Sequence, residues 1–112
     1  MRIYHNPRCS KSRQTLDLIR EAGIEPQIID YLNDIPSEQE LAELVEMLGI
    51  SAEQLVRKGE DDYRLHFKGK ALTDADWIRA MVRYPKLIER PIVVNNKKAV
   101  LGRPPENVRK LL

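Results

Sequence analysis

The apolar residues near the start of the chain follow first a strand pattern and then a helix pattern. Residues 2–5 predict a short strand that ends at a Pro-bearing turn. Residues 10–22 have helical spacing, and Gly23 is a signal for the end of that helix. Residues 27–31 predict a second strand. A strand, a helix and a strand in this order form a βαβ unit, so we expect the two strands to be parallel.

The middle of the chain changes to helical periodicity. Three start signals, each a Ser or Thr with Glu, Gln or Asp three residues later, stand at Ser37, Ser51 and Thr73. The first predicts a helix that ends at Gly49, and the second predicts a short helix through Arg57. The third predicts a helix that Pro85 stops, because proline cannot continue the hydrogen-bond ladder.

The last third of the chain returns to sheet periodicity. Residues 91–94 and 99–101 are apolar runs on either side of the Asn-Asn-Lys-Lys turn at 95–98, which predicts a hairpin. Residues 106–111 predict a closing helix after two prolines. The pattern therefore predicts an α/β chain with a thioredoxin-like, four-stranded mixed sheet. We expect one domain over residues 1–112, with a helical insertion at about 37–89 between the βαβ and ββα halves.

Composition narrows the function classes. Nineteen basic and 17 acidic residues give a net charge of only +2, which does not favour nucleic acid as a partner. No apolar stretch reaches the length of a membrane span, and no apolar leader opens the chain, so we expect a cytoplasmic protein. A single cysteine excludes an internal disulfide and any metal site built on several cysteines, and we expect no metal.

That cysteine, Cys9, stands between the first predicted strand and the start of the following helix. The first turn of a helix has unpaired backbone N–H groups and a positive dipole end. A thiol in this position ionises more easily, and Arg8, Lys11 and Arg13 add positive charge nearby. The same N–H groups can hold an anion. The loop therefore predicts a nucleophile and an oxyanion site together, in place of a buried inert cysteine.

Two further residues are candidates for tuning this thiol. Ser12 stands three residues after Cys9, where a dithiol motif would have its second cysteine, and its hydroxyl could donate a hydrogen bond to the thiolate. His5, at the end of the first strand, could also affect the thiolate. Because Ser12 cannot resolve a disulfide, any catalytic cycle that oxidises Cys9 would require a thiol from another molecule.

The segment Ile-Tyr-His-Asn-Pro-Arg-Cys-Ser-Lys-Ser-Arg at 3–13 strongly resembles the active-site segment of the glutaredoxin-coupled, ArsC-like arsenate reductases. The resemblance continues in order through residues 23–26, 55–57, 85–94 and 102–106, while residues 58–71 are polar and fit the family pattern least. In that family a cysteine thiolate attacks arsenate, and three arginines bind the oxyanion. The matching residues are Cys9, Arg57, Arg90 and Arg103.

The resemblance implies reduction of arsenate to arsenite, with glutathione as co-substrate and glutaredoxin as the protein that clears the resulting disulfide. It also implies that the Arg90–Pro91 bond is cis and that no cofactor is bound. Arginine suits this role because its planar fork of donors matches a tetrahedral oxyanion.

Two other functions remain open from the sequence. Cys9 could act as a monothiol oxidoreductase on glutathionylated proteins or other disulfides. Some relatives with this fold are regulators that bind RNA polymerase and use a two-cysteine switch, which Ser12 rules out here, but a regulator without a switch remains possible.

Overall fold

The computed structural model describes all 112 residues, and the chain divides into two compact units. One unit consists of Met1–Asp34 with Arg90–Leu112, and the other of Ile35–Glu89. The organisation as one domain with an insertion at about 37–89 stays a prediction.

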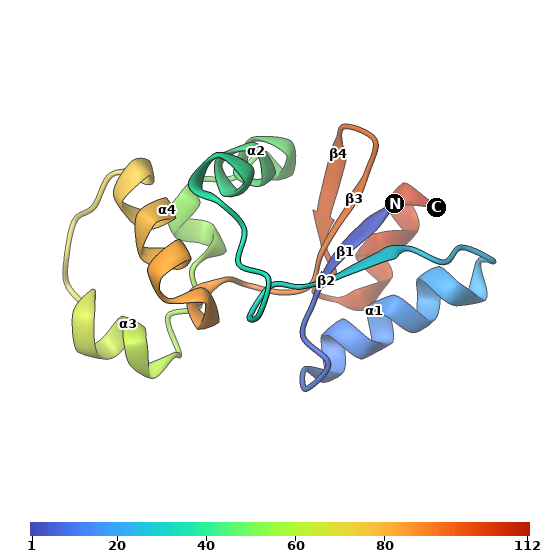
Figure 1. Cartoon of the computed structure of the whole chain (residues 1–112), viewed down its shortest axis with the longest axis horizontal. Coiled ribbons are helices and arrows are strands. Elements are labelled where there is room, and N and C mark those ends of the chain that lie inside the picture. The colour runs from blue at the N-terminus through green and yellow to red at the C-terminus, as the bar shows by residue number, and fades with distance from the viewer. The chain divides into compact units, whose positions relative to one another are not determined.

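The first unit is built on a four-stranded sheet (Figure 1). Its strands are β1 (Arg2–His5), β2 (Gln27–Asp30), β3 (Ile92–Asn95) and β4 (Lys98–Leu101), in the order β2-β1-β3-β4. β1 pairs parallel with β2 and antiparallel with β3, and β3 pairs antiparallel with β4. The predicted thioredoxin-like α/β arrangement with a mixed sheet is therefore confirmed.

Helix α1 (Ser10–Glu21) and the 3-10 helix η3 (Pro105–Leu111) pack against each other beside this sheet. Their shared core contains buried residues from both strands and helices: Ile3, Leu16, Ile19, Val93 and Val108. Helix α1 begins directly after Cys9, its buried side chains recur at the helical spacing of Ser12, Thr15, Leu16 and Ile19, and the chain leaves it through Gly23 at φ +81°. Strand β1 and helix α1 therefore fix the two ends of the loop that contains Cys9.

The hairpin strands differ from the prediction by one residue: β3 is shifted to Ile92–Asn95, and β4 begins one residue earlier, at Lys98. Asn95 pairs with Lys98, so the turn contains only Asn96 and Lys97. Asn96 has a φ of 58°, a left-handed conformation that asparagine tolerates better than most residues. The hairpin places residues 90–91 and 102–103 at the same end of the sheet, since Ile92 pairs with Leu101.

The second unit is helical, with α2 (Glu38–Leu48), η1 (Ala52–Leu55), α3 (Asp61–His66), α4 (Asp74–Arg83) and η2 (Pro85–Leu87). Its core is formed by apolar residues of α2 and α4 with their neighbours: Leu41, Leu44, Leu55, Trp77, Met81 and Leu87. In the three predicted start signals, Ser37 caps α2 through the Glu40 N–H, and Ser51 and Thr73 form complete capping boxes.

Two elements of this unit differ from the prediction. The short helix ends at Leu55, not Arg57, because Val56 forms a bridge with Ile88 and the chain becomes extended there. Helix α3 was not predicted, because its six residues show no repeating apolar pattern. In the structure none of them is buried.

Candidate active site

Cys9 occupies the cap position of α1. Its backbone is extended, with φ −94° and ψ 122°, and its N–H donates to the Asn6 carbonyl at 3.0 Å. Its side chain is half-buried. Cys9 therefore lies where the free N–H groups of the first helical turn meet solvent, the position that favours an ionised thiol.

Two arginines from the ends of the hairpin lie beside this thiol. Arg103 follows β4 and donates from Nη1 to Cys9 Sγ at 3.8 Å and to the Arg90 carbonyl at 3.1 Å. Arg90 precedes β3 and also forms a side-chain hydrogen bond that bears on Cys9. Both arginines are followed by cis prolines, Pro91 and Pro104. The expected cis bond at Pro91 is thus confirmed, whereas the one at Pro104 was not anticipated.

The electrostatic balance at Cys9 favours the thiolate. Burial alone would raise the pKa of the thiol, but the Ser12 backbone N–H, Arg90 and Arg103 outweigh it, and the pKa of Cys9 is lowered from its ordinary value. Each of these groups is a donor or a positive charge that stabilises the anion. The site therefore combines a readily ionised sulfur with two guanidinium groups.

His5 and Ser12 form a buried pair behind Cys9. His5 Nδ1 lies 2.6 Å from Ser12 Oγ, which also accepts a hydrogen bond from the Asn6 N–H at 3.0 Å. Desolvation lowers the pKa of His5 more than the charge of Asp30 raises it, and Arg20 and Arg13 lower it further. His5 is therefore neutral at neutral pH, and the pair positions the Cys9 loop without adding a full charge.

The mode of action predicted for Ser12 needs a correction. The sequence predicts that its hydroxyl donates a hydrogen bond to the thiolate. In the structure this hydroxyl instead forms hydrogen bonds with His5 Nδ1 and the Asn6 N–H. The group of Ser12 that lowers the pKa of Cys9 is its backbone N–H. The physical reason is that the side chain is completely buried beneath the loop, while the amide faces the helix start.

The sequence model of the ArsC family matches residues 4–111, nearly the whole chain.

The chain belongs to the ArsC family.

Its most similar curated relatives include the uncharacterised protein YfgD of Escherichia coli K12, with 48% identity over 114 residues, covering 100% of this chain and 96% of that protein. An arsenate reductase of Haemophilus influenzae is 44% identical over 112 residues, covering 98% and 97% of the two chains. Among solved structures, the arsenate reductase from Vibrio cholerae has 47% identity and a TM-score of 0.94, covering 100% of this chain and 98% of that one.

The resemblance also singles out a third arginine, which belongs to the other compact unit of the chain. Arg57 belongs to the unit Ile35–Glu89, where it forms ion pairs with Glu89 at 2.9 Å and with Glu60 at 3.4 Å. These carboxylates hold the guanidinium within its own unit. The role of Arg57 as an oxyanion ligand stays a prediction.

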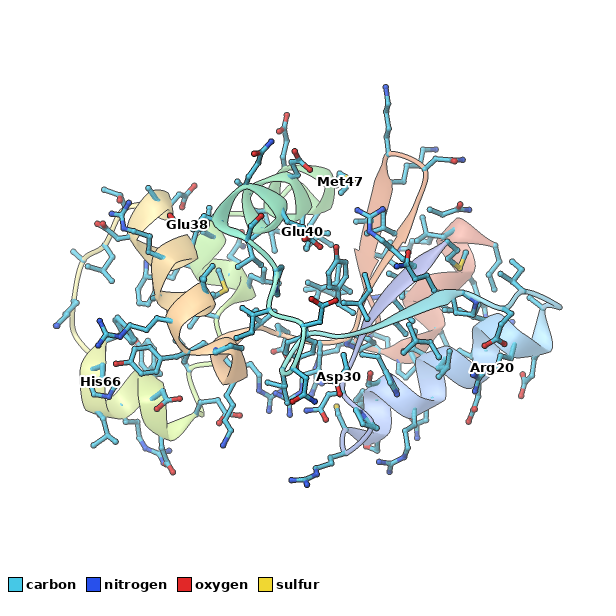
Figure 2. All side chains as sticks on the ribbon, in the orientation of Figure 1. Arg20, Asp30, Glu38, Glu40, Met47 and His66 are labelled. Carbon is cyan, nitrogen blue, oxygen red and sulfur yellow. The ribbon has the colours of Figure 1, made fainter.

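Sequence reasoning missed Asp30. This residue, labelled in Figure 2, ends β2. It is in register with His5 at the end of β1, and its charge acts on the pKa of His5. The parallel pairing of the two predicted strands was the available signal, since residues at the same end of adjacent strands become neighbours. No three His, Cys, Asp or Glu side chains gather where they could hold a metal ion, and no helix has the length and apolar character needed to cross a bilayer.

Lowering of the Cys9 pKa predicts a specific pH dependence of alkylation. The folded chain should react with iodoacetamide at neutral pH faster than a free thiol of pKa about 8.5, because a larger fraction of Cys9 is ionised. The rate should fall only as the pH drops through the lowered pKa. Since Cys9 is the single cysteine, mass spectrometry reports it directly, and the chain in denaturant is the control. Equal profiles for folded and unfolded chain would contradict the electrostatic account.

Gly102 holds the Arg103 loop close to α1. A Cβ at this position would collide with Thr15 Oγ1 and lie 2.7 Å from Pro91 Cγ, and the Gly102 N–H donates to the Pro91 carbonyl at 2.9 Å. Gly102→Ala should therefore destabilise the fold by about 1–3 kcal/mol, the usual cost of overpacking. Urea unfolding would measure it, with Ala22→Gly at the exposed end of α1 as a mild comparison. Unchanged stability would show that the loop relaxes freely.

Proposed function

We propose that this chain reduces arsenate to arsenite, with Cys9 as the nucleophile and glutathione and glutaredoxin as the external reductants. The observation that carries the proposal is the half-buried thiol of lowered pKa with the Arg103 guanidinium 3.8 Å away. The relatives named as arsenate reductases, at 44–47% identity over almost the full chain, supply the substrate.

The chemistry follows from the residues present. The Cys9 thiolate attacks arsenic, an As–O bond breaks, and the oxygen leaves as water after protonation, which gives a sulfur–arsenic(V) adduct. Arg90 and Arg103 stabilise the negative oxygens as charge shifts toward the leaving group. We assign Arg57 as the third oxyanion ligand, on the resemblance alone.

The second half-reaction requires an outside thiol, because the chain has one cysteine. Glutathione attacks the Cys9 sulfur of the adduct, a sulfur–sulfur bond forms, and the sulfur–arsenic bond breaks with its electron pair staying on arsenic. Arsenic is thereby reduced from V to III, and protons complete arsenous acid. Glutaredoxin then takes the glutathione from Cys9 by thiol–disulfide exchange and restores the thiolate. The cytoplasm, which supplies reduced glutathione, is the compartment that this scheme requires.

The test is arsenate-dependent oxidation of glutathione by the purified chain, with each component omitted in turn. We expect turnover only when arsenate, glutathione and glutaredoxin are all present, and none when thioredoxin replaces glutaredoxin. A chain that does not turn over arsenate but rapidly deglutathionylates a test protein is instead a monothiol oxidoreductase. A chain with neither activity that binds RNA polymerase stoichiometrically is a regulator.

A further inference from the structure

The helical unit contains a groove of its own. It lies between α3, the following loop and α4, within residues 64–84, and has a volume of about 720 Å³. It coincides in part with the stretch 58–71, which fits the family pattern least. The groove combines cations with aromatic rings, and the residues that matter are Lys68, Lys70, Arg83, His66, Phe67 and Tyr84.

Positive charge in the groove is only partly balanced. Arg64 and Arg79 also line it, but they form ion pairs with Asp61 and Asp76. Lys68, Lys70 and Arg83 take part in none of the ion pairs of the chain, and all three side chains are exposed. Three cations without carboxylate partners attract an anion more strongly than the net charge of +2 for the whole chain suggests.

Flat rings stand beside these cations. His66, labelled in Figure 2, belongs to α3. Its ring stacks on that of Tyr84, with ring centroids 5.0 Å apart and an interplanar angle of 17°. Phe67 meets Tyr84 edge-on at 5.7 Å. His66 is exposed, and the neighbouring Leu65 is 75% exposed, so this wall offers planar and apolar surface to solvent. A planar group can therefore stack here while a linked anion reaches the cations.

We propose that this groove binds a nucleoside phosphate, with the base against the His66–Phe67 wall and the phosphates at Lys68, Lys70 and Arg83. Cations together with stacking rings are the two elements of nucleotide recognition, because the cations bind the phosphates while the base stacks on a ring. The volume of about 720 Å³ lies within the range of small-ligand sites, roughly 300–1,000 Å³. The limited extent of the charge favours a free nucleotide over a nucleic acid.

The chain contains its own reporter for this site. Trp77, its single tryptophan, has its ring centroid 5.8 Å from that of Phe67 and 6.2 Å from that of Tyr63. Titration with ADP at low salt should change Trp77 fluorescence saturably, and calorimetry should give the same affinity. Inorganic pyrophosphate should bind at least tenfold more weakly than ADP, because it lacks the base. Equal affinity for the two would overturn the base-stacking part and with it the proposal.

Substitutions locate the binding. Lys68→Gln with Lys70→Gln should weaken ADP binding tenfold or more, whereas Lys97→Gln with Lys98→Gln, the same charge change at the hairpin turn, should leave it unchanged. Equal loss in both pairs, or no saturable binding of ADP at millimolar concentration, contradicts the proposal. So does a short single-stranded oligonucleotide or an acidic peptide that binds far more tightly than ADP. Cys9→Ser should bind ADP normally, which separates this site from the proposed reduction.

Discussion

Cys9→Ser should reduce arsenate-dependent oxidation of glutathione to the uncatalysed background. A serine hydroxyl is not ionised at neutral pH and cannot form the sulfur–arsenic bond, whereas the Cys9 thiol has a lowered pKa and stands at the cap of α1. The coupled assay with glutaredoxin measures the loss, and arsenate binding should be weakened far less than turnover.

The comparison variant for this experiment is Gln14→Ala. Gln14 is exposed on α1, five positions after Cys9, and has no place in the proposed site. It should keep wild-type turnover, and both variants should keep the circular dichroism spectrum of the parent. Residual arsenate reduction by Cys9→Ser well above background would show that the sulfur is not the nucleophile.

Arg103→Ala and Arg90→Ala should each lower kcat/KM for arsenate by 100- to 1,000-fold. Loss of one oxyanion donor costs about 2.7–4 kcal/mol of transition-state stabilisation. The same substitutions should raise the pKa of Cys9, since both side chains lower it in the native chain. Steady-state kinetics and the pH profile of alkylation therefore test the two roles separately.

Controls for the arginine variants come from the same chain. Arg109→Ala removes an exposed arginine of η3 and should leave both kcat/KM and the Cys9 pKa unchanged. Arg103→Lys keeps the charge but loses the planar fork of donors. Compared with Arg103→Ala, it should therefore bring the Cys9 pKa closer to the parent value than it brings kcat/KM. Arg57→Ala tests the third assigned ligand, because we expect a loss in kcat/KM of the same size. If kcat/KM barely changes in all three alanine variants, the oxyanion assignment is wrong.

Local patterns were sufficient to predict most of the elements in the sheet unit. The strand–turn–helix order around Cys9 and the hairpin after Pro91 depend on neighbouring residues, and both were found in the structure. Helix α3 was missed for the opposite reason, because its six residues bury no side chain and carry no periodic signal.

The site was less accessible to sequence reasoning than the fold. Proximity of Arg103 to Cys9 spans 94 positions and was expected only from the family resemblance. The use of the Ser12 amide instead of its hydroxyl depends on burial of the side chain against His5, which no local pattern encodes. The influence of Asp30 on His5 depends on the register between β1 and β2.

The central claim is that the Cys9 thiolate attacks arsenate and that glutathione then attacks the Cys9 sulfur of the adduct. Intact mass spectrometry without glutaredoxin tests this claim most directly. The purified chain is incubated with reduced glutathione, with and without arsenate. The account predicts that Cys9 gains one glutathione only when arsenate is present, and that glutaredoxin then removes it. A chain that stays unmodified in arsenate, or gains glutathione equally without it, would contradict the account.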